Sequence, residues 1–325
     1  MDELSRHFIN RFQGGFPIVE QPYSSIAAEL QSDETTLIST IKNLLAQGIL
    51  SRFGPLYNAS CMGGGLTLAA LSVSGEDFDR VAEQVNNLTE IAHNYRREHD
   101  LNMWFVIATE TAEEVQKTIA TIEHLTGLPV YNFPKIQEFY LGLWLSLDRH
   151  GGVTTRSIDV PAKPDKATID ELDRKIIRAT QQGLPLEPSP YSEVAAQCGC
   201  DTQTVITRLR RMLGNGVVRR IGAVPNHYRL GLRSNGMSVW DLPDDRLKIL
   251  GEKIGKLDFV SHCYERPRHL PLWRYNLFAM VHGHNREEVN EKARQISDLL
   301  GCDCNQHEVL FSSGILKKSG LRLVA

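Results

Sequence analysis

Histidine, tyrosine and arginine alternate along two separate stretches of this 325-residue chain. The first stretch carries His93, Tyr95 and Arg97, and the second carries His262, Tyr264 and Arg266. Because every second side chain of a β-strand lies on the same face, each set is expected to line one surface. Arginine binds carboxylates through paired hydrogen bonds, and histidine can transfer protons near neutral pH. With tryptophan and phenylalanine nearby, the sets suit a flat aromatic ligand that carries several carboxylates.

Neighbouring polar and aromatic residues extend both candidate sites. They are Arg96, His99, Asn102 and Trp104 in the first stretch, and Arg268 and Asn276 in the second. The second stretch is longer between its histidine and its asparagine, with 14 positions against 9, and its other histidine, His269, is out of register. Two diverged sites and two unequal halves of one site would both give this pattern, so both interpretations stay open. The second set is expected to be the supporting half.

The elements that must position these residues belong to a repeated unit. Residues 22–54 and 190–222 align without a gap, and 12 of the 33 positions are identical. Each copy begins with three short helical patterns and a strand, which is typical of a winged helix-turn-helix. Asp33 and Asp201 are expected to cap the third helix of each copy. The chain is therefore predicted to contain two tandem copies of one unit.

A second block follows each winged helix. Its strand and helix patterns run in the order β-α-β-β-α-β, which is the order of a ferredoxin-like domain. The predicted fold class is α+β, with two tandem copies of a winged helix-turn-helix plus a ferredoxin-like domain. Residues 136–145 are expected to extend the sheet of the first copy. The predicted segments are winged helices at 1–58 and 169–226, ferredoxin-like domains at 59–146 and 227–325, and a linker at 147–168.

Charge and composition argue against several classes of protein. A net charge of −3 and an isoelectric point of about 6.4 give no basic field that would attract nucleic acid. No apolar run reaches the roughly 18 residues of a membrane span, and the N-terminal residues do not resemble a signal peptide. The Cys-x-Cys pairs at 198–200 and 302–304 lack the partners of a metal site, so reduced thiols and no bound metal are expected. A cytoplasmic protein without a membrane partner is predicted.

The motifs resemble those of a known enzyme family. A winged helix followed by a ferredoxin-like domain is similar to the Lrp/AsnC family of leucine-responsive regulators. The sequence H-N-Y-R-R-E-H-x-x-N-x-W-F begins at His93, H-C-Y-E-R-P-R begins at His262, and W-R-Y-N-L-F-A-M-V-H-G begins at Trp273. These motifs resemble the two subunit types of siroheme decarboxylase, in the fused form found in haem d1 biosynthesis. The resemblance covers nearly the whole chain.

The resemblance implies a carboxy-lyase that removes two acetate carboxyl groups from siroheme and gives didecarboxysiroheme. It implies that His93 or His99 protonates the carbon left by loss of carbon dioxide, and that Tyr95 orients the carboxylate or relays the proton. A histidine that ligates the iron is an open alternative. The remaining candidates would bind substrate, and they are Arg96, Arg97, Asn102, Trp104, His262, Tyr264, Arg266, Arg268 and Asn276. No cofactor is expected, because iron enters within the substrate.

The main alternative is a ligand-responsive transcriptional regulator of the Lrp/AsnC type. The predicted recognition helix of the first copy, at 34–43, has one lysine and one glutamate, whereas a DNA-binding helix normally carries several cations. The second copy is more basic, with Arg208, Arg210 and Arg211 in the helix and Arg219 and Arg220 in the wing. We expect winged helices that pair the two copies and do not bind nucleic acid. A homodimer and further subunits of the haem d1 pathway stay open as partners.

Overall fold

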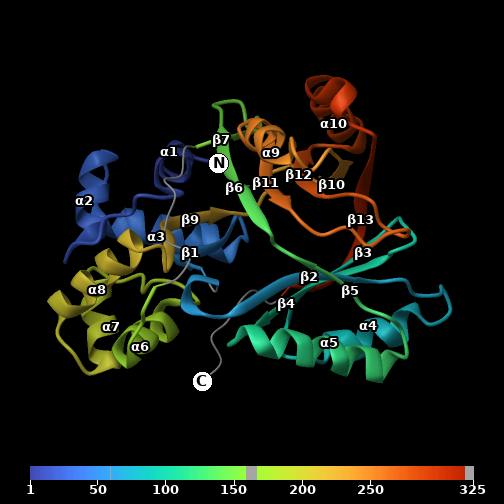
Figure 1. Ribbon diagram of the computed structural model, residues 1–325. Coiled ribbons are helices and arrows are strands. Elements are labelled where there is room, and N and C mark those ends of the chain that lie inside the picture. The colour runs from blue at the N-terminus through green and yellow to red at the C-terminus, as the bar shows by residue number, and fades with distance from the viewer. Residues whose placement is uncertain (59, 159–166, 319–325) are drawn as a thin grey trace.

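The computed structural model describes residues 1–58, 60–158 and 167–318 of the chain. Its two winged helices lie together on one side, and its two ferredoxin-like halves lie together on the other (Figure 1). The copies therefore pair domain by domain instead of forming two separate units along the chain.

Each winged helix consists of three helices and one wing strand. The first copy contains α1 (Glu3–Phe12), α2 (Pro22–Glu29), α3 (Glu34–Ala46) and β1 (Leu50–Tyr57). The second contains α6 (Glu171–Thr180), α7 (Pro190–Cys198), α8 (Thr202–Gly214) and β9 (Val218–Pro225). Asp33 and Asp201 each accept a hydrogen bond of 2.9 Å from the backbone N–H three residues later. Both aspartates are therefore the predicted N-caps.

Reciprocal contacts hold the two winged helices together. Strands β1 and β9 pair antiparallel with each other. The Tyr23 phenol donates a hydrogen bond to the carbonyl oxygen of Pro185 at 2.8 Å, and Tyr191 donates one to that of Pro17 at 3.0 Å. Apolar side chains from both copies form a single core around these contacts. The tyrosine of the repeated Pro-Tyr-Ser sequence thus pairs the copies, as the scaffold interpretation of the winged helices requires.

Both ferredoxin-like halves follow the predicted order of elements. The first contains β2 (Gly65–Leu71), α4 (Phe78–Asn86), β3 (Ile91–Arg97), β4 (Met103–Thr109), α5 (Ala112–Thr126) and β5 (Tyr131–Pro134). The second contains β10 (Ser234–Asp241), α9 (Leu247–Gly255), β11 (Val260–Glu265), β12 (Leu277–Gly283), α10 (Arg286–Leu300) and β13 (Gln306–Lys318). Short 3-10 helices occupy Ser60–Met62 and Gly301–Asp303. The predicted fold class is confirmed.

The two halves share one nine-stranded sheet in the order β5-β2-β4-β3-β13-β10-β12-β11-β6. Strand β13 pairs first with β10 and then with β3 of the other half. Strand β6 (Gln137–Leu141) pairs with β11, so the expectation that residues 136–145 extend the first copy's own sheet is wrong. Only residues 135–136 separate the edge strands β5 and β6, so the sheet curves back on itself. Helices α4 and α5 cover one half, and α9 and α10 cover the other (Figure 1).

A hairpin after β6 changes the predicted domain boundary. Strands β7 (Trp144–Leu147) and β8 (Val153–Arg156) pair with each other. The Gln13 side chain, at the end of α1, bonds the carbonyl oxygen and the N–H of Leu145 at 2.7 and 2.8 Å. The hairpin therefore packs with the first winged helix, because its polar backbone is satisfied there.

The predicted linker at 147–168 consequently begins inside an ordered hairpin. Its residues 159–166, and residues 319–325 of the predicted last domain, lie outside the described residues. Among the helices that are described, none has the length and apolar character needed to cross a membrane.

Candidate active site

Two matching clusters of side chains lie on β3 and β11. We call His93, Tyr95 and Arg97 cluster one, and His262, Tyr264 and Arg266 cluster two. In cluster one the histidine and tyrosine ring centroids are 6.2 Å apart, and the guanidinium lies 6.0 Å from the tyrosine ring. The corresponding distances in cluster two are 6.0 and 5.0 Å. Each set therefore shares one strand face, as alternation predicted.

The arginine of each cluster reaches across to the other copy. Arg97 donates a hydrogen bond of 2.6 Å to the carbonyl oxygen of Leu310, and Arg266 donates one to that of Phe133. Burial lowers the pKa of each guanidinium to about 10, so both stay charged at neutral pH. The Nε atoms of both are buried and have no hydrogen-bond partner among the described residues. Each arginine thus keeps a donor that a carboxylate could satisfy.

A tyrosine that the sequence analysis missed lies beside cluster one. Burial raises the pKa of Tyr228 and of Tyr95, and the charge of Arg97 partly offsets this for both phenols. Tyr228 comes from the second copy, three residues after the end of β9, so side chains from both copies lie at cluster one. Tyr228 lies outside the aligned residues 190–222, so the repeat comparison did not single it out, although it and the adjacent His227 are the residue types found in both clusters.

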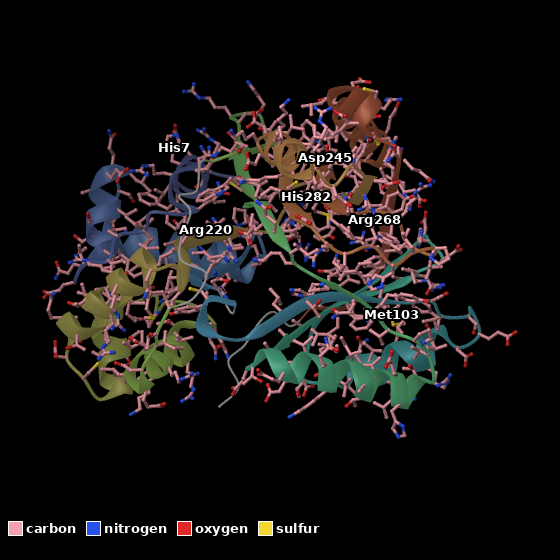
Figure 2. All side chains as sticks on the ribbon, viewed as in Figure 1. His7, Met103, Arg220, Asp245, Arg268 and His282 are labelled. Carbon is pink, nitrogen blue, oxygen red and sulfur yellow. The ribbon has the colours of Figure 1, made fainter. Side chains whose placement is uncertain are left out.

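A chain of hydrogen bonds connects cluster two to Tyr228. His262 Nδ1 lies 2.8 Å from the Ser261 hydroxyl, which lies 2.7 Å from His282 Nε2. His282 Nδ1 lies 2.6 Å from Asn235 Oδ1. Asn235 Nδ2 lies 3.2 Å from the Nε2 of His227, and the Asn235 side chain also bonds the Tyr228 phenol. His282 is buried within the second half (Figure 2).

The amide of Asn235 sets the direction of this chain. Its oxygen can only accept, so His282 carries its proton on Nδ1 and accepts from Ser261 through Nε2. The Ser261 oxygen then accepts from His262 Nδ1–H, which leaves His262 Nε2 without a proton. Burial lowers the pKa of His262 to about 4. Cluster two therefore presents a neutral histidine that accepts a hydrogen bond and is a poor proton donor at neutral pH.

A carboxylate lies beside cluster two. Glu138 of β6 lies opposite Tyr264 in the sheet register. Its oxygens lie 3.3 Å from Arg219 Nη1 and 2.8 Å from Lys135 Nζ. The charges of Glu138, Arg219 and Arg266 all act on the pKa of His262. An anionic ligand would have to share this space with a negative side chain.

The structure does not bring His99 or Arg96 to cluster one, and their roles in catalysis and substrate binding stay predictions. His99 lies two residues beyond Arg97, the last residue of β3. The extended strand from His93 to Arg97 is itself about 13 Å long. Its Nδ1 accepts from the N–H of Leu101 at 2.8 Å, and its ring packs against Trp273. Arg96 points to the helix-covered face, with its guanidinium 4.2 Å from the Phe78 ring.

The two asparagines predicted to bind substrate make structural hydrogen bonds to the backbone. Asn102 bonds both the N–H and the carbonyl of Val73, at 3.0 and 2.8 Å. Asn276 bonds the same two groups of Leu242, each at 3.0 Å. These contacts hold adjacent strand ends together. The substrate-binding roles of both asparagines stay predictions.

The predicted binding roles of Trp104 and Arg268 are also not supported. Trp104 is fully buried and stacks on Phe133 with ring centroids 5.1 Å apart. Arg268 bonds the carboxylates of Asp241 and Asp244 and two backbone carbonyls, which uses four of its five N–H donors. Among the described residues, no group of three or more histidine, cysteine or acidic side chains could hold a metal ion. No disulfide joins the cysteines that the structure describes.

Comparisons with known proteins agree with this architecture. A profile described as an AsnC-like ligand binding domain matches residues 63–140 and 229–317. A profile described as the siroheme decarboxylase NirDL-like HTH domain matches residues 5–50 and 173–219. Each profile matches both copies, which supports the internal repeat.

Full-length relatives and a solved structure extend the similarity over nearly the whole chain. A siroheme decarboxylase of Hydrogenobacter thermophilus is 32% identical over 310 residues, covering 94% of this chain and 90% of the relative. A siroheme decarboxylase NirH subunit of Paracoccus pantotrophus is 55% identical over 154 residues, covering 47% of this chain and 96% of the subunit. The crystal structure of the siroheme decarboxylase NirDL in complex with an iron-uroporphyrin III analogue has a TM-score of 0.71 and 28% identity, and covers 98% of this chain and 93% of that one. The chain belongs to the siroheme decarboxylase family.

Proposed function

We propose that this chain removes two acetate carboxyl groups from siroheme to give didecarboxysiroheme, and that cluster one is where each group is lost. The observation that carries this assignment is the buried Arg97, whose Nε has no partner among the described residues and lies beside the phenols of Tyr95 and Tyr228. A desolvated guanidinium gains more from an anion than an exposed one does, because water no longer screens the attraction. An acetate carboxylate of the substrate supplies that anion.

Loss of carbon dioxide leaves an electron pair on the methylene carbon of the former acetate. The conjugated macrocycle delocalises this pair, and a proton must then be added to give a methyl group. Each step therefore consumes one proton, releases one carbon dioxide and transfers no electron. The reaction as written therefore needs no separate cofactor, and the iron enters as part of the substrate.

His93 is the proposed proton donor. It is the cluster-one residue whose side-chain type titrates nearest neutral pH. Tyr95 is a weaker candidate for the acid, because burial raises the pKa of its phenol and the proton is held more tightly. We assign Tyr95 and Tyr228 to hydrogen bonds with the departing carboxylate. A role of His93 as an iron ligand is the alternative that a spectrum of the bound complex would test.

The experiment is anaerobic incubation of the purified chain with siroheme, followed by mass analysis of the tetrapyrrole. The expected products are lighter by one and then by two carbon dioxide units. Siroheme that is bound yet recovered unchanged would overturn the assignment. A binding titration on the same sample separates a failure to bind from a failure to react.

Further subunits are proposed as partners. The relative from Paracoccus pantotrophus is named a subunit, and 96% of it is matched by about half of this chain. Each copy therefore has the size of one such subunit, and pairing within the chain replaces one contact between separate subunits. Light scattering of the chain alone, and after mixing with other decarboxylase subunits, measures whether a larger assembly forms.

A further inference from the structure

Equivalent positions opposite the two cluster tyrosines carry different side chains. In the register of β6 against β11, Glu138 lies opposite Tyr264. In the register of β13 against β3, Ile315 lies opposite Tyr95. An irregularity in the pairing follows both positions, after which the register resumes at Tyr140 and Lys317. Residues that lie directly opposite in antiparallel strands share one face, so Glu138 and Ile315 face corresponding clusters.

The charge of Glu138 is held in place by two cations. Burial opposes ionisation of this carboxyl, but Arg219 and Lys135 outweigh it and the pKa of Glu138 is lowered. Its side chain is 27% exposed, so solvent screens the charge only in part. This charge acts on His262 and Tyr264 of cluster two, so a substrate carboxylate that approaches them would meet it.

Cluster one has an apolar residue in the corresponding place. Ile315 is 48% exposed, although it lies opposite Tyr95. An exposed apolar side chain opposite Tyr95, on the strand face that also carries Arg97, suits a flat macrocycle with carboxylate substituents, because each part of the ligand meets a matching surface.

We propose that Glu138 determines which cluster accepts the tetrapyrrole: its negative charge beside cluster two repels a substrate carboxylate, and Ile315 places no charge beside cluster one. The chain then binds one siroheme at the cluster with the proton donor. This inference rests on the proposed function, because it takes siroheme as the ligand. It goes further in assigning a specificity-determining residue outside both clusters.

The test exchanges the two residues, since each is already accommodated at the equivalent position. Siroheme is titrated anaerobically into the full chain, and the number of bound equivalents is read from the absorption spectrum. The wild-type chain is expected to bind one equivalent. Glu138→Ile is expected to add a second equivalent, and Ile315→Glu is expected to weaken binding at cluster one by at least about 10-fold.

Glu138→Gln separates the effect of charge from that of shape. It also replaces Glu138→Ile in the test if that variant does not fold. It keeps the volume of the side chain, so a second equivalent in this variant identifies the charge as the barrier. Two equivalents in the wild-type chain would overturn the proposal. One unchanged equivalent in the folded Glu138 variants, or full affinity in Ile315→Glu, would also overturn it.

Product masses measured on the same samples keep the two proposals apart. One bound equivalent of siroheme that is not decarboxylated contradicts the proposed function but does not contradict the role of Glu138. Two bound equivalents with normal product contradict the role of Glu138 alone.

Discussion

Arg97 donates a hydrogen bond of 2.6 Å to the backbone carbonyl of Leu310, a residue of the other copy. Arg266 makes the mirror contact to Phe133. Arg97, the cation proposed to bind substrate, therefore also ties the two halves of the sheet together, as Arg266 does. Binding and assembly of the two copies depend on the same side chains.

Replacing Arg97 with lysine is expected to weaken both functions. Lysine keeps the charge but cannot bond Leu310 and a carboxylate through one planar fork. Siroheme affinity should fall by roughly 10- to 100-fold, and unfolding should require about 1.5–3 kcal/mol less. Arg96→Lys, on the opposite face of the same strand, is the matched control and should change neither quantity appreciably. Titration with siroheme and urea denaturation measure the two effects.

The two histidines of the first stretch are expected to behave differently. His93→Gln should lower the decarboxylation rate by about 10²–10⁴-fold, because it removes the proposed acid, with little loss of binding. His99→Gln should keep the rate within a few-fold, since His99 bonds the N–H of Leu101 instead of facing cluster one. Single-turnover rates at saturating enzyme separate chemistry from binding. Equal rates for wild type and His93→Gln would move the proton donor elsewhere.

Repetition in the sequence identified the architecture but could not separate a site from its scaffold. Asn102 and Asn276 recur in both copies beside the clusters, and each clamps the backbone of a neighbouring strand. The tyrosines of the repeated Pro-Tyr-Ser sequence recur for a similar reason, since Tyr23 and Tyr191 bond the opposite copy. A residue required twice for packing looks the same in a sequence as one required twice for chemistry.

The residues that the sequence analysis missed are those that differ between the copies. Tyr228 and Glu138 reach their clusters from distant segments, one after a wing and one on a strand that crosses to the other half. Periodicity within a strand predicts which side chains share its face, as it did for His93 and Tyr95. It cannot predict which strand from the other copy will lie alongside, because that pairing is set by tertiary contacts.

Stability is expected to fall between about pH 6.5 and pH 4. Burial lowers the pKa of His262 from 6.5 to about 4 and also lowers that of His282. The unfolded chain therefore binds more protons than the folded chain in this window, so stability is present above it and is lost as the pH falls. His262 alone is expected to lower the free energy of unfolding by at most about 3 kcal/mol.

His262→Gln should flatten this pH dependence in urea denaturation measured from pH 7 to pH 4. His7→Gln, at an exposed position on α1, should leave it unchanged and is the control. Carboxylates such as Glu288, with a pKa of about 2, act at lower pH and do not account for the same window. An unchanged slope in His262→Gln would show that this histidine does not titrate as proposed.

The contact between the wing strand β9 and the first copy is expected to tolerate no added methyl group at Gly222. A Cβ at Gly222 would lie 2.7 Å from the backbone carbonyl carbon of Gln13, in the other copy. Gly222→Ala should destabilise the chain by about 1–3 kcal/mol, because backbone cannot easily move away. Gly214→Ala at the end of α8 meets no atom within 4 Å and should be neutral or slightly stabilising. Thermal unfolding compares the two variants.

The basic residues that favoured DNA binding by the second winged helix are bonded within the chain. Arg208 Nη1 lies 2.6 Å from Asp170 and 3.0 Å from Asp173, and Arg211 also bonds Asp173. Arg210 donates to the carbonyl oxygen of Ile18 at 2.7 Å. In the wing, the two arginines bond Glu138 and the carbonyl of Gln13. Phosphates would have to compete with these partners for the same donors.

We therefore predict no sequence-selective DNA binding in mobility shifts at about 0.15 M salt. Non-specific affinity for DNA comes mainly from free lysine and arginine side chains that release counterions from phosphates, and these arginines are already paired. Asp170→Asn is the matched variant, since asparagine keeps the N-cap of α6 while the ion pair with Arg208 is lost. It should raise weak, salt-sensitive binding without adding sequence preference. Nanomolar binding of the wild-type chain to a specific site, altered by a tetrapyrrole, would instead favour a regulator.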